Sequence, residues 1–154
     1  MSKPVSPIPP GFHTITPSII VKGAEAAMAL YKKAFGAEEV MCMRGPTGGI
    51  MHAEMKIGDS IFMLSDEWPN MGMKAPAPNH ISGGLHLYVP DADRAFQRAI
   101  EAGCTAVMPP SNMFWGDRYG KVMDSFGHVW GLATHIEDVS PEECARRGAA
   151  WKPS

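Results

Sequence analysis

The sequence lacks several features that would each have indicated a definite class of protein. Its 154 residues include three cysteines, Cys42, Cys104 and Cys144, and no two of them are spaced as a Cys-x-x-Cys motif. This usage excludes a disulfide framework and is typical of buried, reduced thiols in a cytoplasmic protein. No apolar run approaches the roughly 18 residues that a membrane helix needs. The N-terminal segment shows no apolar core of a secretory signal, so we expect a cytoplasmic protein without a membrane partner.

Clustered charge of one sign is also missing. The chain has 14 Lys and Arg against 16 Asp and Glu, which leaves a net charge of −2, and the basic residues are scattered. Nucleic acids and anionic membranes bind basic patches, so we expect neither as a partner. No GxSxG nucleophile motif occurs, and the glycine-rich stretch at residues 45–49 lacks the Lys-Ser/Thr of a phosphate-binding loop. We interpret that stretch as a turn.

What the sequence does contain is an internal repeat. Residues 18–40 (SIIVKGAEAAMALYKKAFGAEEV) and residues 86–107 (HLYVPDADRAFQRAIEAGCTAV) follow one plan. Each begins with an apolar strand, continues through a short polar step into an amphipathic helix, and reaches a glycine, Gly36 or Gly103, suited to a left-handed helix C-cap. The apolar helix faces comprise Ala27, Tyr31, Ala34 and Phe35 in the first copy and Ala92, Ala95, Phe96, Ala99 and Ile100 in the second.

After each helix the apolar pattern changes to period two, which is typical of β-strands. Turns are predicted at Gly58-Asp59 and at residues 124–127, and a final short helix is predicted to begin after Ser140 and to run to about Arg147. The sequence therefore predicts an α+β fold of two tandem βαβββ units. We expect an extended arm at 1–13, unit one at 14–66, a Pro-rich linker at 67–81, unit two at 82–136 and a tail with the short helix at 137–154.

Two tandem βαβββ units resemble the vicinal-oxygen-chelate superfamily, which includes glyoxalase I, the bleomycin-resistance proteins and the extradiol dioxygenases. More narrowly, the chain is similar to the PhnB-like branch. The resemblance extends from about Thr14 to Arg147, and its segments are VKGAEAAMALYKKAFGAEEV, MHAEMKIGDSIFMLSDE, WGDRYGKVMDSFGHVWGLATH and EDVSPEE. It implies that each unit forms a half-barrel of four strands and that two half-barrels, within one chain or across a homodimer, enclose a cavity.

The resemblance also implies where a metal would be bound in the members that use one. Four His, Glu or Gln ligands come from the first and last strands of both units, and the metal acts as a Lewis acid. In this chain those positions fall on Thr16, Gly84, Met63 and Gly131, none of which is a good ligand for zinc, nickel, iron or manganese. A slip of two residues would place His86 at the Gly84 position.

Other residues offer an alternative site. If Met51, Ala53, Met55 and Ile57 pack on the helix, His52 and Glu54 point into the cavity, as does His86. Their arrangement favours one of two sites. All three side chains would form a non-standard metal site, or His52 and Glu54 alone would form a catalytic pair for proton transfer. The simpler interpretation is a hydrogen-bonded polar lining of the pocket.

The segment from Phe114 to His135 divides into two parts. The part from Asp124 onward is predicted to have a structural role. We expect Gly127 in a turn, Gly131 facing the cavity and Trp130 packed in the core. Before it, Trp115, Arg118 and Tyr119 lie at a junction that edges the ligand pocket in the PhnB-like branch. There Trp115 would stack on a flat ligand and Arg118 would pair with an anion, unless they form a packed surface loop.

Two functions follow from these expectations. The first is a protein that binds a small aromatic or amphipathic molecule without chemistry, in a pocket lined by His86, Trp115, Arg118, Tyr119 and Met63. The second is a metal-dependent lyase, isomerase or dioxygenase that uses His52, Glu54 and His86. A third is a catalytically silent dimer that serves as an interaction module.

Overall fold

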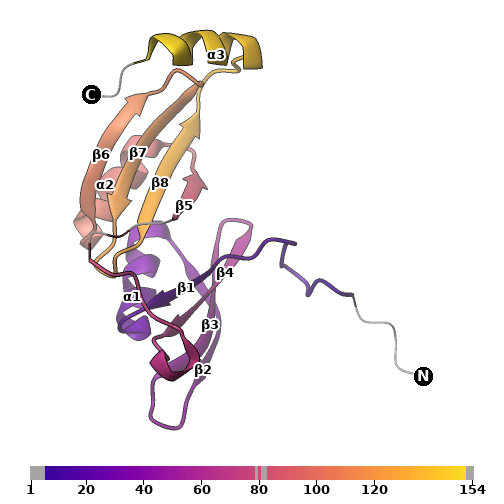
Figure 1. Ribbon diagram of the computed structural model, residues 1–154, viewed down its shortest axis with the longest axis vertical. Helices are drawn as coiled ribbons and strands as arrows, with labels where there is room; N and C mark the ends of the chain where they lie inside the picture. The colour runs from indigo at the N-terminus through magenta and orange to yellow at the C-terminus, as the bar shows by residue number, and fades with distance from the viewer. Residues whose placement is uncertain (1–5, 79, 81–82, 152–154) are drawn as a thin grey trace. The chain divides into compact units, whose positions relative to one another are not determined.

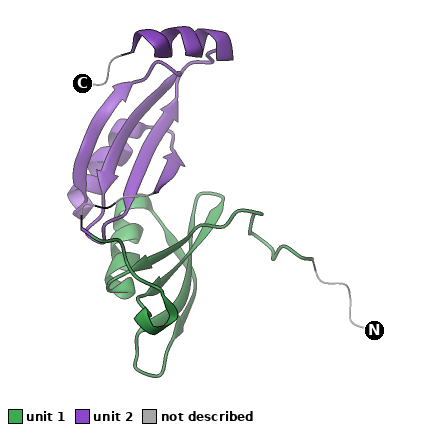
Figure 2. Cartoon of the chain, in the orientation of Figure 1, with its two compact units in different colours: residues 1–77 green, residues 78–154 purple. Residues whose placement is uncertain are grey.

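The computed structural model describes residues 6–78, 80 and 83–151 (Figure 1). It divides the chain into two compact units, Met1–Ala77 and Pro78–Ser154 (Figure 2). The division falls inside the predicted linker, which also contains the 3-10 turn η1 (Pro69–Met71) and an isolated bridge between Trp68 and Met73.

Each unit has the same order of elements. Unit one consists of β1 (Ser18–Val21), α1 (Ala24–Phe35), β2 (Glu38–Arg44), β3 (Ile50–Ile57) and β4 (Ser60–Asp66). Unit two consists of β5 (Gly84–Tyr88), α2 (Ala92–Ala102), β6 (Thr105–Asn112), β7 (Asp117–Met123), β8 (Val129–His135) and α3 (Pro141–Ala150). None of the helices within the described ranges has the length and apolar character needed to cross a membrane.

The two sheets have matching topology. The strand orders are β1-β4-β3-β2 and β5-β8-β7-β6. In each sheet the first strand pairs in parallel with the last, and the remaining pairs are antiparallel. This arrangement confirms the prediction of an α+β fold with two tandem βαβββ units.

One face of each sheet packs on the helix of its own unit and forms the core. In unit one the core includes Tyr31 of α1 with Met55 and Leu64 of the sheet, and in unit two it includes Trp130 and Leu132. The left-handed C-caps predicted at the two helix ends are confirmed, with φ of 65° at Gly36 and 115° at Gly103.

One core prediction is wrong, because Met51 is 46% exposed. The pairing of β2 with β3 shifts register between Met43 and Arg44, close to Met51. The Met51 side chain lies beside Gly45, where an added Cβ would be 3.0 Å from its Cγ and 3.3 Å from the Trp68 ring. The irregularity thus takes Met51 out of the alternation that places Ala53 and Met55 in the core.

The last strand of each sheet holds the N-terminus of the helix in its unit. The Asp66 carboxylate on β4 accepts hydrogen bonds from the backbone N–H groups of Gly23 at 3.1 Å and Ala24 at 2.7 Å. The Thr134 hydroxyl on β8 accepts one from Ala92 N–H at 2.8 Å. Unpaired N–H groups at a helix start need acceptors, and here a strand supplies them in both copies.

The predicted final helix exists and is longer than expected. Helix α3 runs to Ala150 instead of ending near Arg147. Ser140 caps it as predicted, with its hydroxyl accepting a hydrogen bond from Glu143 N–H at 3.2 Å. Arg147 pairs with Glu137 at 2.8 Å and Glu143 at 2.8 Å, which ties the helix to the segment that follows β8.

Candidate ligand pocket

The candidate site lies on the sheet face of unit two that points away from α2. Alternate residues of β7, namely Asp117, Tyr119 and Lys121, share this face with Gly131 of β8 and His86 of β5. The strand register places both Lys121 and His86 directly beside Gly131. The prediction that Gly131 and Trp130 face opposite ways is confirmed by the complete burial of Trp130, whose exposed fraction is 0%.

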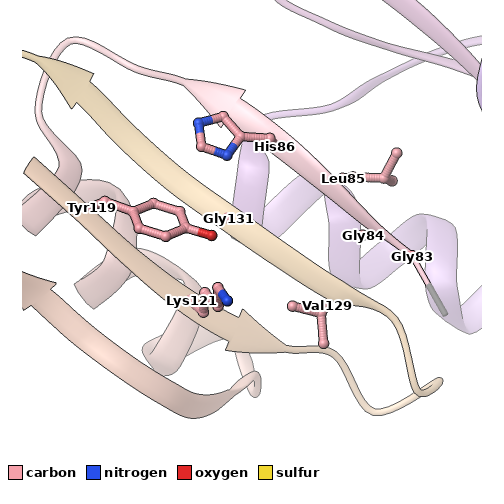
Figure 3. A pocket seen from close by; sticks show the side chains of 8 residues that line it. All are labelled: Gly83, Gly84, Leu85, His86, Tyr119, Lys121, Val129 and Gly131. Atoms are coloured by element: carbon pink, nitrogen blue, oxygen red, sulfur yellow. The ribbon is translucent and has the colours of Figure 1, made fainter. Parts of the chain in front are cut away.

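A pocket of about 320 Å³ opens on this face (Figure 3). That volume is at the small end of the roughly 300–1,000 Å³ of ligand sites, which suits a molecule of one or two rings. The pocket has a backbone floor rich in glycine and walls from longer side chains. Its lining residues are Gly83, Gly84, Leu85, His86, Tyr119, Lys121, Val129 and Gly131.

Gly131 creates the space in which two rings meet. The His86 and Tyr119 rings stack with centroids 5.2 Å apart and an interplanar angle of 25°. Figure 3 shows the two rings extending from β5 and β7 toward Gly131 on the strand between them. A Cβ at Gly131 would lie 2.9 Å from Tyr119 Cε2 and 3.0 Å from His86 Nδ1, closer than van der Waals contact allows. Glycine at this position is therefore required by the ring pair.

Lys121 adds a positive charge beside the same rings. Its Nζ lies 5.7 Å from the centroid of the Tyr119 ring, within the range of a cation–π interaction. Lys121 is half-buried, as is Tyr119, whereas His86 is more exposed. The pocket therefore combines flat apolar surfaces with a cation and an imidazole.

Asp117 organises the neighbouring part of the face. Its carboxylate is 2% exposed and accepts three side-chain hydrogen bonds. Tyr88 donates its hydroxyl at 3.0 Å, Trp115 its indole N–H at 3.1 Å, and His135 contributes Nδ1 at 2.9 Å. The other His135 nitrogen, Nε2, lies 2.8 Å from Asp138 Oδ1.

These contacts shift three pKa values. Burial raises the pKa of the Asp117 carboxyl, but the hydrogen bonds from His135, Tyr88 and Trp115 outweigh it and hold that pKa below its ordinary value. The hydrogen bond to Asp138, followed by the one to Asp117, raises the pKa of His135. The hydrogen bond to Asp117 raises the pKa of Tyr88. The cluster thus favours an ionised Asp117 beside a protonated His135 and a neutral Tyr88.

Two of the aromatic residues predicted to edge the pocket lie near it. Tyr119 lines the pocket, and Trp115 packs edge-on against Tyr119 with centroids 5.9 Å apart. Trp115 is not among the residues that line the pocket, because its indole is directed to Asp117. Its position next to Tyr119 makes it a support for the Tyr119 ring.

The ligand-binding role predicted for Arg118 requires correction. Arg118 alternates with Tyr119 along β7, so its side chain lies on the helix side of the sheet. Its guanidinium pairs through two nitrogens with Asp93 of α2 and through a third with Asn112 of β6 at 3.0 Å. The arginine joins helix to sheet, and the cation of the pocket is Lys121, three residues further along and on the opposite face of the strand.

The predicted pair in unit one is in contact. His52 Nε2 lies 3.1 Å from Glu54 Oε1 on β3, and both side chains are partly buried. The strand register places Met43 beside His52, and Met41 and Met63 beside Glu54. His86, the third residue of the predicted alternative site, lies on β5 of the other unit. Within the described ranges, no group of three or more His, Cys, Asp or Glu side chains is placed to hold a metal ion.

The residues at the metal positions implied by the resemblance do not fit a metal. Gly84 and Gly131 offer no side-chain donor, and the space above Gly131 is taken by the rings of His86 and Tyr119. The Thr16 hydroxyl donates a hydrogen bond to the backbone oxygen of His13 at 3.1 Å. Met63 offers only a neutral thioether, which is not among the Cys, His, Asp and Glu side chains that hold zinc in proteins.

Sequence reasoning missed Lys121, Tyr88 and the role of Asp117. The signal was present in part, since Asp117, Tyr119 and Lys121 alternate along one strand and must share a face. The contact of Tyr88 with Asp117 joins residues 29 positions apart, and it depends on the pairing of β5 with β8 and of β8 with β7.

Comparison with known proteins places this geometry in a family context. Residues 11–132 match the family model described as the Glyoxalase/Bleomycin resistance protein/Dioxygenase superfamily. An uncharacterized protein of Mycobacterium bovis is 40% identical over 133 residues, which cover 84% of this chain and 88% of the relative.

Solved structures share the fold at lower identity. TioX from Micromonospora sp. ML1 superposes with a TM-score of 0.63 at 24% identity, covering 80% of this chain and 99% of that one. A Bacillus cereus structure described as a putative 3-demethylubiquinone-9 3-methyltransferase, PhnB protein, has a TM-score of 0.60 at 19% identity, covering 79% and 99%. Similarity at this level shows the fold alone.

Proposed function

Because the chain belongs to the glyoxalase/bleomycin resistance/dioxygenase superfamily, we propose that it binds a small aromatic or amphipathic molecule in the pocket of unit two. The fold hosts many chemistries, so the proposal depends on the site itself. The observation that carries it is the ring pair of His86 and Tyr119 over Gly131, at the edge of a 320 Å³ pocket. Flat surfaces beside a glycine floor suit a planar ligand.

Each part of the pocket has a role in this proposal. The absence of a Cβ at Gly131 lets the Tyr119 and His86 rings lie close to the sheet and present their surfaces to the pocket. Tyr119 and His86 offer ring faces and edges for stacking, and Val129 adds an apolar wall. Trp115 limits the movement of Tyr119 through their edge-on contact.

Replacing Gly131 by alanine tests the pocket. Its new Cβ must displace Tyr119 and His86, so we expect the affinity for two probes, 2-naphthoate and 2-naphthamide, to fall about tenfold or more. Overpacking costs about 1–3 kcal/mol, and about 1.4 kcal/mol corresponds to a factor of ten. Titration of the full chain, followed by NMR shifts of the Tyr119 and Lys121 amides, provides the measurement.

The control is Gly49→Ala in unit one, where an added Cβ meets only Asp66 Oδ2 at an ordinary 3.6 Å. This variant should bind both probes like the unmodified chain. If Gly131→Ala also bound both probes unchanged while remaining folded, the pocket would not be the binding site.

A second candidate function is an enzyme, favoured by the contact of His52 with Glu54. A carboxylate that orients an imidazole is a common arrangement for proton transfer. If these residues also hold a divalent metal, elemental analysis of the full chain loaded with zinc, nickel, iron or manganese should find about one ion per chain. That ion should be lost in His52→Ala and retained in His13→Ala. No bound metal after loading would contradict a metal-dependent reaction.

We also propose that the protein belongs to the PhnB-like branch and forms a homodimer in the cytoplasm. The resemblance of segments such as WGDRYGKVMDSFGHVWGLATH to that branch supports the assignment. Light scattering on the full chain should give twice the chain mass of 16.7 kDa, and a monomeric mass would contradict the dimer.

A further inference from the structure

The lining of the pocket in unit two contains basic side chains and no acidic ones. Its eight lining residues include Lys121 and His86 but no carboxylate. The nearest acidic group along β7 is Asp117, whose two oxygens already accept hydrogen bonds from Tyr88, Trp115 and His135. A negative group of a ligand would therefore meet a cation without a competing protein anion in the lining.

Within the part of the chain that the structure describes, Lys121 has no acidic partner, in contrast to three arginines of the same unit. Arg118 pairs with Asp93, and Arg146 and Arg147 pair with Glu143. Among the described residues, the interaction of Lys121 is the cation–π contact with Tyr119. A half-buried ammonium group that lacks an anion gains a charge-assisted hydrogen bond when a carboxylate or phosphonate arrives.

The geometry places this charge next to the aromatic surface. Lys121 and His86 are both register neighbours of Gly131, one on each side of β8. A ligand ring that packs against Tyr119 can therefore carry an acidic substituent to Lys121 without leaving the pocket. A cationic ligand at the same place would be repelled by the ammonium group.

From these observations we infer that the natural ligand is an aromatic anion of one or two rings, whose carboxylate or similar acidic group binds Lys121. This inference rests on the proposed function, since it names the class of ligand for the same pocket. The ring of the ligand would stack on Tyr119 and His86, and Lys121 would favour a negatively charged ligand over a neutral or cationic one.

The test compares two probes of nearly equal shape, 2-naphthoate and 2-naphthamide, on the full chain. We expect 2-naphthoate to bind about tenfold more tightly at low salt, since a charge-assisted contact is roughly twice as strong as a neutral one. Lys121→Met keeps the apolar stem and removes the charge, so the preference for 2-naphthoate over 2-naphthamide should be lost. Lys121→Arg should retain the preference.

The matched control is Lys22→Met, an exposed lysine outside the pocket, which should keep the preference. Binding of 2-naphthamide reports that each variant is folded. Equal affinity for both probes in the unmodified chain, or a preference that survives in Lys121→Met, would overturn the inference. If both probes bind equally and both bind more weakly to Gly131→Ala, the pocket remains the binding site and only the inferred negative charge of the ligand is wrong. If neither probe binds, the proposed function and the inference both fail.

Discussion

Replacing Gly116 by alanine is expected to destabilise unit two by about 3 kcal/mol or more. Gly116 has φ of 99°, in the left-handed region that side chains rarely adopt. An added Cβ would lie 2.1 Å from the backbone oxygen of Glu137 and 3.0 Å from Val139 Cγ2. The backbone itself must move, and that movement disturbs the hydrogen bonds that Gly116 O accepts from Ile136 N–H at 2.9 Å and Glu137 N–H at 3.0 Å.

Gly48→Ala separates the two causes of this loss. Gly48 has a similar φ of 86°, but nothing lies within 4 Å of an added Cβ. It should cost only the conformational penalty of about 1–2 kcal/mol. Urea unfolding followed by circular dichroism gives both values, and equal losses for the two variants would show that the contact with Glu137 carries no cost.

Replacing Asp124 by alanine should destabilise unit two by a similar amount, about 3 kcal/mol. The Asp124 carboxylate is buried in the turn between β7 and β8. One oxygen accepts hydrogen bonds from the backbone N–H groups of Phe126 and His128, each at 2.9 Å, and the other from the Trp130 indole at 2.9 Å. Alanine would leave the fully buried indole N–H without this acceptor and loosen the turn.

The control is the turn at the same place in unit one. Asp59 is exposed, and its carboxylate accepts a hydrogen bond from the neighbouring Ser60 hydroxyl. Asp59→Ala should therefore change the free energy of unfolding by no more than about 0.5 kcal/mol. A loss below about 1 kcal/mol for Asp124→Ala would contradict a structural role for the indole contact. Trp130 fluorescence should also shift in Asp124→Ala, because its polar partner is removed.

Much of the fold followed from local patterns. The repeat, the two helix faces and the glycine C-caps at positions 36 and 103 could be predicted from residues close in sequence. Helix and strand periods depend only on spacing along the chain. The prediction failed at Met51, where a change of register between β2 and β3 removes a residue from the alternation. Such an irregularity depends on the partner strand, which the local pattern does not specify.

The candidate site could be predicted only in part. Tyr119 was expected near the pocket from the resemblance to the PhnB-like branch. The facing of His86 and Gly131 was expected from strand alternation, counted from the ligand positions that the resemblance implies. His52 and Glu54 are in contact because they are two residues apart on one strand. Arg118 was expected either to pair with an anion at the edge of the pocket or to lie in a packed surface loop, and its phase along β7 places it on the helix side of the sheet. Asp93, which binds it, lies 25 residues earlier on α2.

The sequence by itself determined the units, their elements and, outside the irregularity near Met51, the alternation of strand residues between two faces, because these depend on short-range periodicity. Only the tertiary structure decided which residues meet across strands: Tyr88 with Asp117, Trp130 with Asp124, and His86 with Tyr119 over Gly131. The physical reason is that strand register and helix packing bring distant residues within hydrogen-bonding and stacking distance. Those contacts bring His86, Tyr119 and Lys121 together in the lining of one pocket.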